Sequence, residues 1–137
     1  MREWLRRLEP LALVAAGGFV GAALRFAVAE ALPAQALPWG TLAANVAGAF
    51  LLSLLLYENR LVGSLSAETR LVVGTGFCSS FTTYSTFAVE TAGLAGLPAL
   101  GTAAGATPLL AVVNVALTYV LGFVAIGLGQ VVARVMA

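Results

Sequence analysis

The sequence predicts an all-α membrane protein with four transmembrane helices. Of its 137 residues, 61% are apolar and only 9% are charged, whereas an ordinary soluble domain carries roughly 25% charged residues. The apolar residues form four runs, at about 11–31, 39–57, 70–97 and 107–133, and about 20 residues suffice for one spanning helix. We therefore expect residues 1–137 to form a single four-helix domain, multi-pass in the cell membrane, or in the inner membrane of a host that has two.

The composition excludes several function classes. The chain has seven Arg and six Glu but no Asp, Lys or His, and its net charge is +1. A Ser-His-Asp triad, a histidine zinc site and a Walker-type phosphate loop all need residue types that are missing. So few basic groups also exclude a nucleic-acid interface. We expect neither an enzyme nor a nucleic-acid partner, and the single cysteine, Cys78, allows no internal disulfide.

The first apolar run follows a basic segment, Met1–Glu9, which we expect to lie at the interface as an amphipathic lead-in. Apolar character continues through all four runs, so we do not expect a cleaved signal peptide. Gly17, Gly21 and Arg25 recur at steps of four, and a G-x-x-x-G packing seam therefore ends in an arginine. A guanidinium at that depth must snorkel, pair or face a wet vestibule.

The second run carries one polar stripe and one stripe of small residues. Thr41 and Asn45 are four apart and share a helix face, with Ala44 and Gly48 on an adjacent stripe. The small residues favour close approach of another helix. An amide in hydrocarbon needs a partner or water, so Asn45 is either a hydrogen bond between helices or part of a polar site.

The third run contains the main anomaly. Segment 79–86 reads Ser-Ser-Phe-Thr-Thr-Tyr-Ser-Thr, with six Ser or Thr in eight positions. Clustered hydroxyls compete for backbone partners and favour a helix break. Non-helical backbone in the middle of a membrane is tolerated only where it is buried in protein or lines a wet cavity. Two interpretations stay open, an ion or substrate site at the midplane and a polar helix-helix seam.

The fourth run begins with Thr107 and Pro108, an N-cap followed by a proline at the first helical position. Asn114, Thr118 and Gly122 then recur at steps of four, and hydrogen bonding between helices is the favoured reading because nothing else polar surrounds them. The connections between the four runs are predicted at Leu32–Pro38, at Glu58–Thr69 and within 93–106.

The polar groups inside the predicted spans are neutral ones: hydroxyls, two amides and aromatic rings. Neutral donors suit an anion, and carbonyls freed by a helix break suit a small hard cation. Tyr84 and Phe87 share a helix face, and their electropositive ring edges can also meet an anion. Four helices pack around a filled core, so we expect a conduction path at a subunit interface.

Three segments, Gly17–Arg25, Gly40–Gly48 with Phe50, and Gly76–Phe87, resemble the signatures of the Fluc (CrcB) fluoride channels, in the right order and spacing. The resemblance covers all four runs. It implies a passive fluoride-selective channel that exports toxic fluoride. It also implies an antiparallel, dual-topology dimer with two narrow pores and a central structural sodium ion.

The same resemblance assigns roles to individual residues. Asn45 corresponds to the pore asparagine that contacts fluoride and supports the phenyl rings, and Phe87 matches the second phenylalanine of the family's Thr-Thr-Phe-Ser-Thr-Phe run. Tyr84 stands where the first phenylalanine is usual, so this ring adds a hydroxyl donor and bulk. The polar residues that the resemblance adds to the pore are Thr41, Ser85 and Thr118.

For sodium, the resemblance implies ligation by backbone carbonyls that map to Ser79 and Thr82. The family usually has glycines at positions 79 and 80, and serine resists some backbone conformations that glycine permits. Arg25 and Glu90 are expected at a pore mouth or vestibule, although either could also be an interfacial anchor.

Two other function classes are alternatives. A small dual-topology multidrug exporter is also four-helical, but it would need a mid-membrane glutamate in the first helix, and Glu30 is too near the end of its run. A non-transporting accessory subunit would use the small and hydroxyl residues only as packing seams.

The arginines predict an orientation. With four spans, six of the seven lie on one side, and only Arg25 lies toward the other. By the positive-inside rule we expect both termini in the cytoplasm. An antiparallel dimer would then pair this chain with an oppositely oriented paralogue, the alternative being a dimer with itself. The six are Arg2, Arg6, Arg7, Arg60, Arg70 and Arg134.

Overall fold

The computed structural model describes residues 2–57, 65–97 and 107–136, and all regular structure within these ranges is helical. Three long helices dominate: α1 (Arg2–Ala31), α2 (Trp39–Tyr57) and α7 (Pro108–Met136). Leu8–Ala31 of α1 and the whole of α2 and α7 are long and apolar enough to cross a membrane. The chain is therefore an all-α, multi-pass membrane protein.

The predicted third span is interrupted. Short α4 (Ala67–Thr69) leads into η1 (Arg70–Cys78), a wider π-type helix, and then into α5 (Ser79–Phe81). Thr82 and Thr83 are extended, with φ/ψ of −83°/158° and −150°/128°, before α6 (Tyr84–Leu94) begins. The break falls inside the hydroxyl-rich segment, so the predicted interruption is confirmed.

The helix ends follow local hydrogen bonds. The Leu110 N–H donates to Thr107 Oγ1 at 3.3 Å, which confirms the predicted cap of α7. Ser66 Oγ accepts from the Thr69 N–H at 3.2 Å, so helix begins at Ala67 and the second connection is shorter than predicted. Residues 58–64 of that connection and 98–106 of the third lie outside the described residues.

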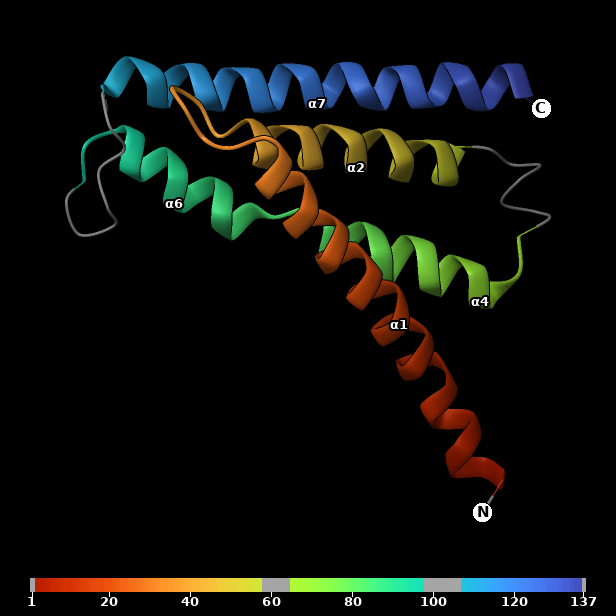
Figure 1. Cartoon of the computed structure of the whole chain (residues 1–137). Coiled ribbons are helices and arrows are strands. Elements are labelled where there is room, and N and C mark those ends of the chain that lie inside the picture. Colours follow the sequence, from red (N-terminus) through yellow and green to blue (C-terminus); the bar gives the residue numbers. More distant parts are fainter. Residues whose placement is uncertain (1, 58–64, 98–106, 137) are drawn as a thin grey trace.

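The first helix is longer than its apolar run. It continues through Pro10 to Arg2, so the predicted lead-in is part of the same helix as the span. Figure 1 shows this N-terminal part of α1 extending away from the other helices. The connection between α1 and α2 is non-helical at residues 32–38, as predicted.

Two helix pairs organise the bundle. Helices α2 and α7 run side by side (Figure 1) and are joined by a 2.7 Å hydrogen bond from Ser53 Oγ to the Ile126 carbonyl. Helix α1 packs against η1 and α5. A Cβ at Gly17 would overlap the Val72 carbonyl, and one at Gly21 would overlap the Phe77 carbonyl. The backbones therefore touch along the predicted glycine seam.

Candidate functional site

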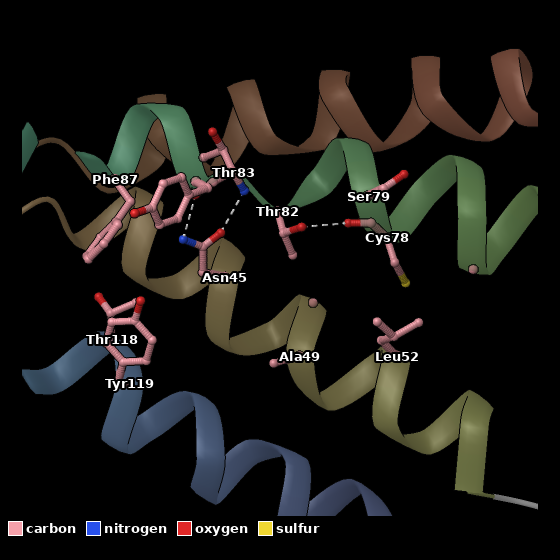
Figure 2. Close-up of a pocket in the computed structure, with 13 residues that line it drawn as sticks. Asn45, Ala49, Leu52, Cys78, Ser79, Thr82, Thr83, Phe87, Thr118 and Tyr119 are labelled. Atoms are coloured by element: carbon pink, nitrogen blue, oxygen red, sulfur yellow. Dashed lines mark hydrogen bonds between the residues drawn. The ribbon is translucent and has the colours of Figure 1, made fainter. Parts of the chain in front are cut away.

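The helix break is held by a side chain from α2. Asn45 Nδ2 donates to the Thr83 carbonyl at 3.0 Å, and the Thr83 N–H donates back to Asn45 Oδ1 at 2.8 Å. Figure 2 shows both hydrogen bonds reaching across from α2. Asn45 therefore forms the hydrogen-bonded link between helices that one of its two interpretations predicted.

This pairing changes what the neighbouring carbonyls can do. In a continuing α-helix the Thr83 N–H would bond to the Ser79 carbonyl four residues earlier. It donates to Asn45 instead, so the Ser79 carbonyl lacks its helical donor. The Ser79 hydroxyl is turned back onto the Thr75 carbonyl, and Thr82 Oγ1 donates to the Cys78 carbonyl at 3.0 Å.

Arg25 reaches the break from α1. Its Nε donates to the Ser80 carbonyl at 3.1 Å. A continuing helix would give that carbonyl the N–H of Tyr84. Arg25 thus contacts the break directly, as well as lining a pocket described below.

Thr83 starts the helix beyond the break. Its Oγ1 accepts from the Thr86 N–H at 3.2 Å and lies 3.0 Å from Thr86 Oγ1, which is the capping geometry expected of a threonine before a helix. Ser85 Oγ lies 3.3 Å from the same oxygen. The cap sets the direction of α6 and hence the positions of Tyr84 and Phe87.

Three aromatic rings lie in sequence beside the break. Phe87 is 7% exposed, and its ring centroid lies 6.0 Å from that of Tyr84 and 6.3 Å from that of Tyr119 on α7. The rings of Phe87 and Tyr119 are nearly perpendicular. Tyr84 and Tyr119 are 74% and 51% exposed in the single chain. Sequence reasoning missed Tyr119, although its place directly after Thr118 on a polar stripe was an available signal.

A pocket of about 450 Å³ lies between the break, α2 and α7. It brings together six of the ten predicted site residues, and its wall is otherwise mainly apolar or aromatic. Figure 2 shows its residues facing one another from these elements. The six are Asn45, Ser79, Thr82, Tyr84, Phe87 and Thr118.

A second pocket, of about 190 Å³, contains three more of the predicted residues: Arg25, Thr41 and Glu90. Thr41 Oγ1 donates to Glu90 Oε1 at 2.9 Å. Glu90 Oε2 is buried and has no hydrogen-bond partner among the described residues. Thr83 lines both pockets, so the break separates them, while Ser85 lines neither.

Asn114 connects α7 to α6 near the aromatic rings through Thr91. It is 1% exposed, and its Nδ2 donates to Thr91 Oγ1 at 2.9 Å. Thr91 Oγ1 in turn donates to the Phe87 carbonyl at 2.7 Å. The favoured reading of Asn114 as a hydrogen bond between helices is confirmed.

The available donors favour a hard ion. Among the described residues no group of three or more His, Cys, Asp or Glu could hold a metal. Carbonyl and hydroxyl oxygens at the break are instead the ligand types of alkali and alkaline-earth cations. The amide, hydroxyl and ring-edge hydrogens of the first pocket suit a small anion.

Comparison with known proteins gives consistent matches. Residues 12–130 match the family described as CrcB-like protein, Camphor Resistance (CrcB). The chain is 51% identical over 124 residues to "Fluoride-specific ion channel FluC 1" of Natronomonas pharaonis, covering 90% of this chain and 93% of the relative. The protein of the same name from Haloarcula marismortui is 45% identical over 130 residues, covering 95% and 90%. "Fluoride-specific ion channel FluC 2" of Halobacterium salinarum is 50% identical over 123 residues, covering 89% and 84%.

Proposed function

Because this chain belongs to the CrcB family, we propose that it is a fluoride-specific ion channel that lets fluoride leave the cell passively and so lowers its toxicity in the cytoplasm. The observation that carries the proposal is identity of 45–51% to relatives of that name over nearly the whole chain. The neutral lining of the larger pocket agrees with it, because a conducted anion must be held without being trapped.

The fluoride path passes through the larger pocket. Asn45 Nδ2 has two N–H groups, and within the described part of the chain it donates only to Thr83, which leaves the other N–H for an anion. The ring edges of Phe87 and Tyr84 and the hydroxyl of Thr118 supply further donors. These groups replace water around fluoride without offering a full positive charge.

The smaller pocket is the vestibule of that path. Arg25, Thr41 and Glu90 meet there, and Thr83 lies between it and the larger pocket. An arginine in a low-dielectric cleft attracts anions. Ser85, two residues after Thr83 in the chain, lines neither pocket but is exposed, and we assign it to the polar surface of the path that a second subunit would cover.

Four spans form the domain over residues 1–137, with η1, α5 and α6 together making the third. The channel is an antiparallel dimer in the cell membrane, either a dual-topology dimer with itself or a pair with an oppositely oriented paralogue. Support comes from the exposure of Tyr84 and Tyr119 beside the pocket, because ring edges and polar groups that line a path need a second wall. Another subunit can supply that wall.

The backbone carbonyls of Ser79 and Thr82 would hold a structural Na⁺, which we place at the subunit interface. The fit of the residues rests on the Ser79 carbonyl, whose helical N–H partner is diverted to Asn45. Both residues line the larger pocket. When bound, the ion would supply a positive charge that neutralises the carbonyl dipoles around it.

Liposome flux tests the function. Protein purified from its own membrane, with any subunit that accompanies it, is reconstituted into liposomes loaded with fluoride. We expect electrogenic fluoride efflux when valinomycin supplies the counter-current, with no proton gradient. Efflux that requires a proton gradient indicates an exporter, and absence of efflux indicates an accessory subunit; either result overturns the proposal.

A further inference from the structure

We propose that Arg25 is a positioning residue for the helix break, and that its hydrogen bond to Ser80 fixes the Ser79 and Thr82 carbonyls at the cation site. The inference deepens the proposed function, since it rests on the sodium site proposed above. This role differs from that of a charge at the pore mouth, which attracts anions but does not position the backbone of the break.

The glycine seam of α1 puts Arg25 within reach. Gly17, Gly21 and Arg25 lie at steps of four and therefore on one face of the helix. At the two glycines the α1 backbone touches η1 so closely that a Cβ would overlap a carbonyl oxygen. One turn further along the same face, the Arg25 side chain meets the Ser80 carbonyl at 3.1 Å. The seam thus holds the arginine at a fixed height relative to the break.

Two side chains then divide the backbone groups of the break between them. Asn45, from α2, takes the N–H and the carbonyl of Thr83. Arg25, from α1, takes the Ser80 carbonyl. Because the two anchors come from different helices, they fix the end of α5 and the start of α6 independently.

Arg25 and the two proposed ligand residues line different pockets. Arg25 lines the smaller pocket, whereas Ser79 and Thr82 line the larger one. The guanidinium therefore donates to the Ser80 carbonyl from the side away from the proposed cation site. A donor to Ser80 at this position prevents that carbonyl from turning toward the ion and keeps the α5 backbone in register for the other two.

The test compares Arg25→Gln with Arg25→Met. Glutamine carries Nε2 at the same position along its side chain as arginine Nε, so it keeps a donor for Ser80 without the charge. Methionine has similar length and no donor. The assay measures thermal unfolding of the purified, intact assembly across a series of Na⁺ concentrations, with choline replacing Na⁺ to keep ionic strength constant.

We expect Arg25→Met to raise the Na⁺ concentration for half-maximal stabilisation about tenfold, the effect of losing one hydrogen bond from a charged donor. Arg25→Gln should stay within about twofold of the parent protein. Hydrogen exchange of the 79–86 segment gives a second measurement, and it should be faster in the methionine variant alone. Rescue by glutamine is the result that a role in charge alone does not give.

Equal impairment of the two variants overturns the inference, because it assigns the effect to the lost charge. Parent-like behaviour of both variants overturns it too, as does a parent protein whose unfolding is insensitive to Na⁺. If the variants differ as expected but the parent passes no fluoride, the inference holds and the proposed fluoride function fails. The two proposals are therefore separable in one set of preparations.

Discussion

Asn45 and Thr83 exchange two hydrogen bonds, of 3.0 and 2.8 Å, so that a side-chain amide on α2 pairs with both backbone groups of a residue in the helix break. Each such bond contributes roughly 1 kcal/mol net, but a buried backbone group left unpaired costs about 1–3 kcal/mol. The pairing therefore stabilises a backbone conformation that would be costly inside a membrane. It also fixes the amide in the pocket wall.

Replacing Asn45 by Asp should abolish conduction. A carboxylate still accepts from the Thr83 N–H, but it cannot donate to the Thr83 carbonyl, and its charge repels an anion in the pocket. We expect fluoride efflux from liposomes to fall by about a hundredfold or more, while the protein still inserts and remains folded. Parent-like efflux from the folded variant would contradict the placement of the fluoride path in this pocket.

Replacing Phe87 by Ile should reduce fluoride efflux about tenfold or more, because it removes a ring edge worth roughly 1 kcal/mol and the ring contacts with Tyr84 and Tyr119. Phe123 on α7 is 69% exposed, so Phe123→Ile is the matched control and should leave efflux unchanged. Insertion and assembly are checked by size-exclusion chromatography. If the two variants conduct alike, Phe87 takes no part in the path.

The sodium site predicts opposite results for two neighbouring substitutions. Ser79→Ala should keep Na⁺-dependent stability, because the proposed ligand is the carbonyl, whereas the hydroxyl bonds back to the Thr75 and Gly76 carbonyls one turn earlier. Thr82→Pro should lose it. Proline removes the Thr82 N–H that donates to the Cys78 carbonyl at 3.1 Å, and it disfavours the helical conformation of Phe81 before it.

The measurement for this pair is thermal unfolding with and without Na⁺. A parent protein that is equally stable and equally active after exhaustive sodium removal would rule out a structural ion. A large loss in Ser79→Ala alone would show that the ligand is the hydroxyl.

The α1 seam predicts a difference between two glycines. A Cβ at Gly21 would overlap the Phe77 carbonyl, whereas one at Gly122 on α7 meets no atom within 4 Å among the described residues beyond its own stretch of helix. Gly21→Ala should therefore destabilise the protein by about 1–3 kcal/mol through overpacking. Gly122→Ala should be neutral or slightly stabilising, because alanine is the better helix former. Thermal unfolding in detergent compares the two, and equal midpoints would show that the seam yields easily.

The sequence was sufficient for the features that depend on local chemistry. The density of Ser and Thr at 79–86 predicted the break, and Thr107 before Pro108 predicted the start of α7. Steps of four predicted the glycine seam, since they follow from helix geometry alone. These features need no knowledge of which helices pack together.

The rest depends on tertiary contacts. The residues near Asn45 in the chain do not predict that its amide pairs with Thr83, 38 residues later. Arg25 meets Ser80 across 55 residues, so its local sequence left snorkelling, pairing and a wet vestibule equally open. Tyr119 reaches Phe87 only because α7 packs against α6. Thr41 and Asn45 are one helical turn apart but line different pockets. That difference depends on where α6 packs, which the local sequence does not show.

The distribution of the seven arginines between the two sides of the membrane predicts the orientation of the chain. With the four spans that the sequence predicts, six of the seven are expected on the side of the two termini and of the second connection, and only Arg25 toward the other side. Arg25 is also bonded within the bundle, so it contributes little to the charge of a loop. The positive-inside rule therefore predicts that this chain inserts mainly with both termini in the cytoplasm.

Cysteine labelling in intact cells checks this orientation. Cys78 is replaced by Ala, and a single cysteine is placed at position 1 or at position 137. We expect both positions to react mainly with a membrane-permeant reagent and to resist an impermeant one. That result, together with an antiparallel dimer, requires an oppositely oriented paralogue as the partner. Equal labelling from both sides would instead establish a dual-topology homodimer, because each orientation would then supply half of the assembly.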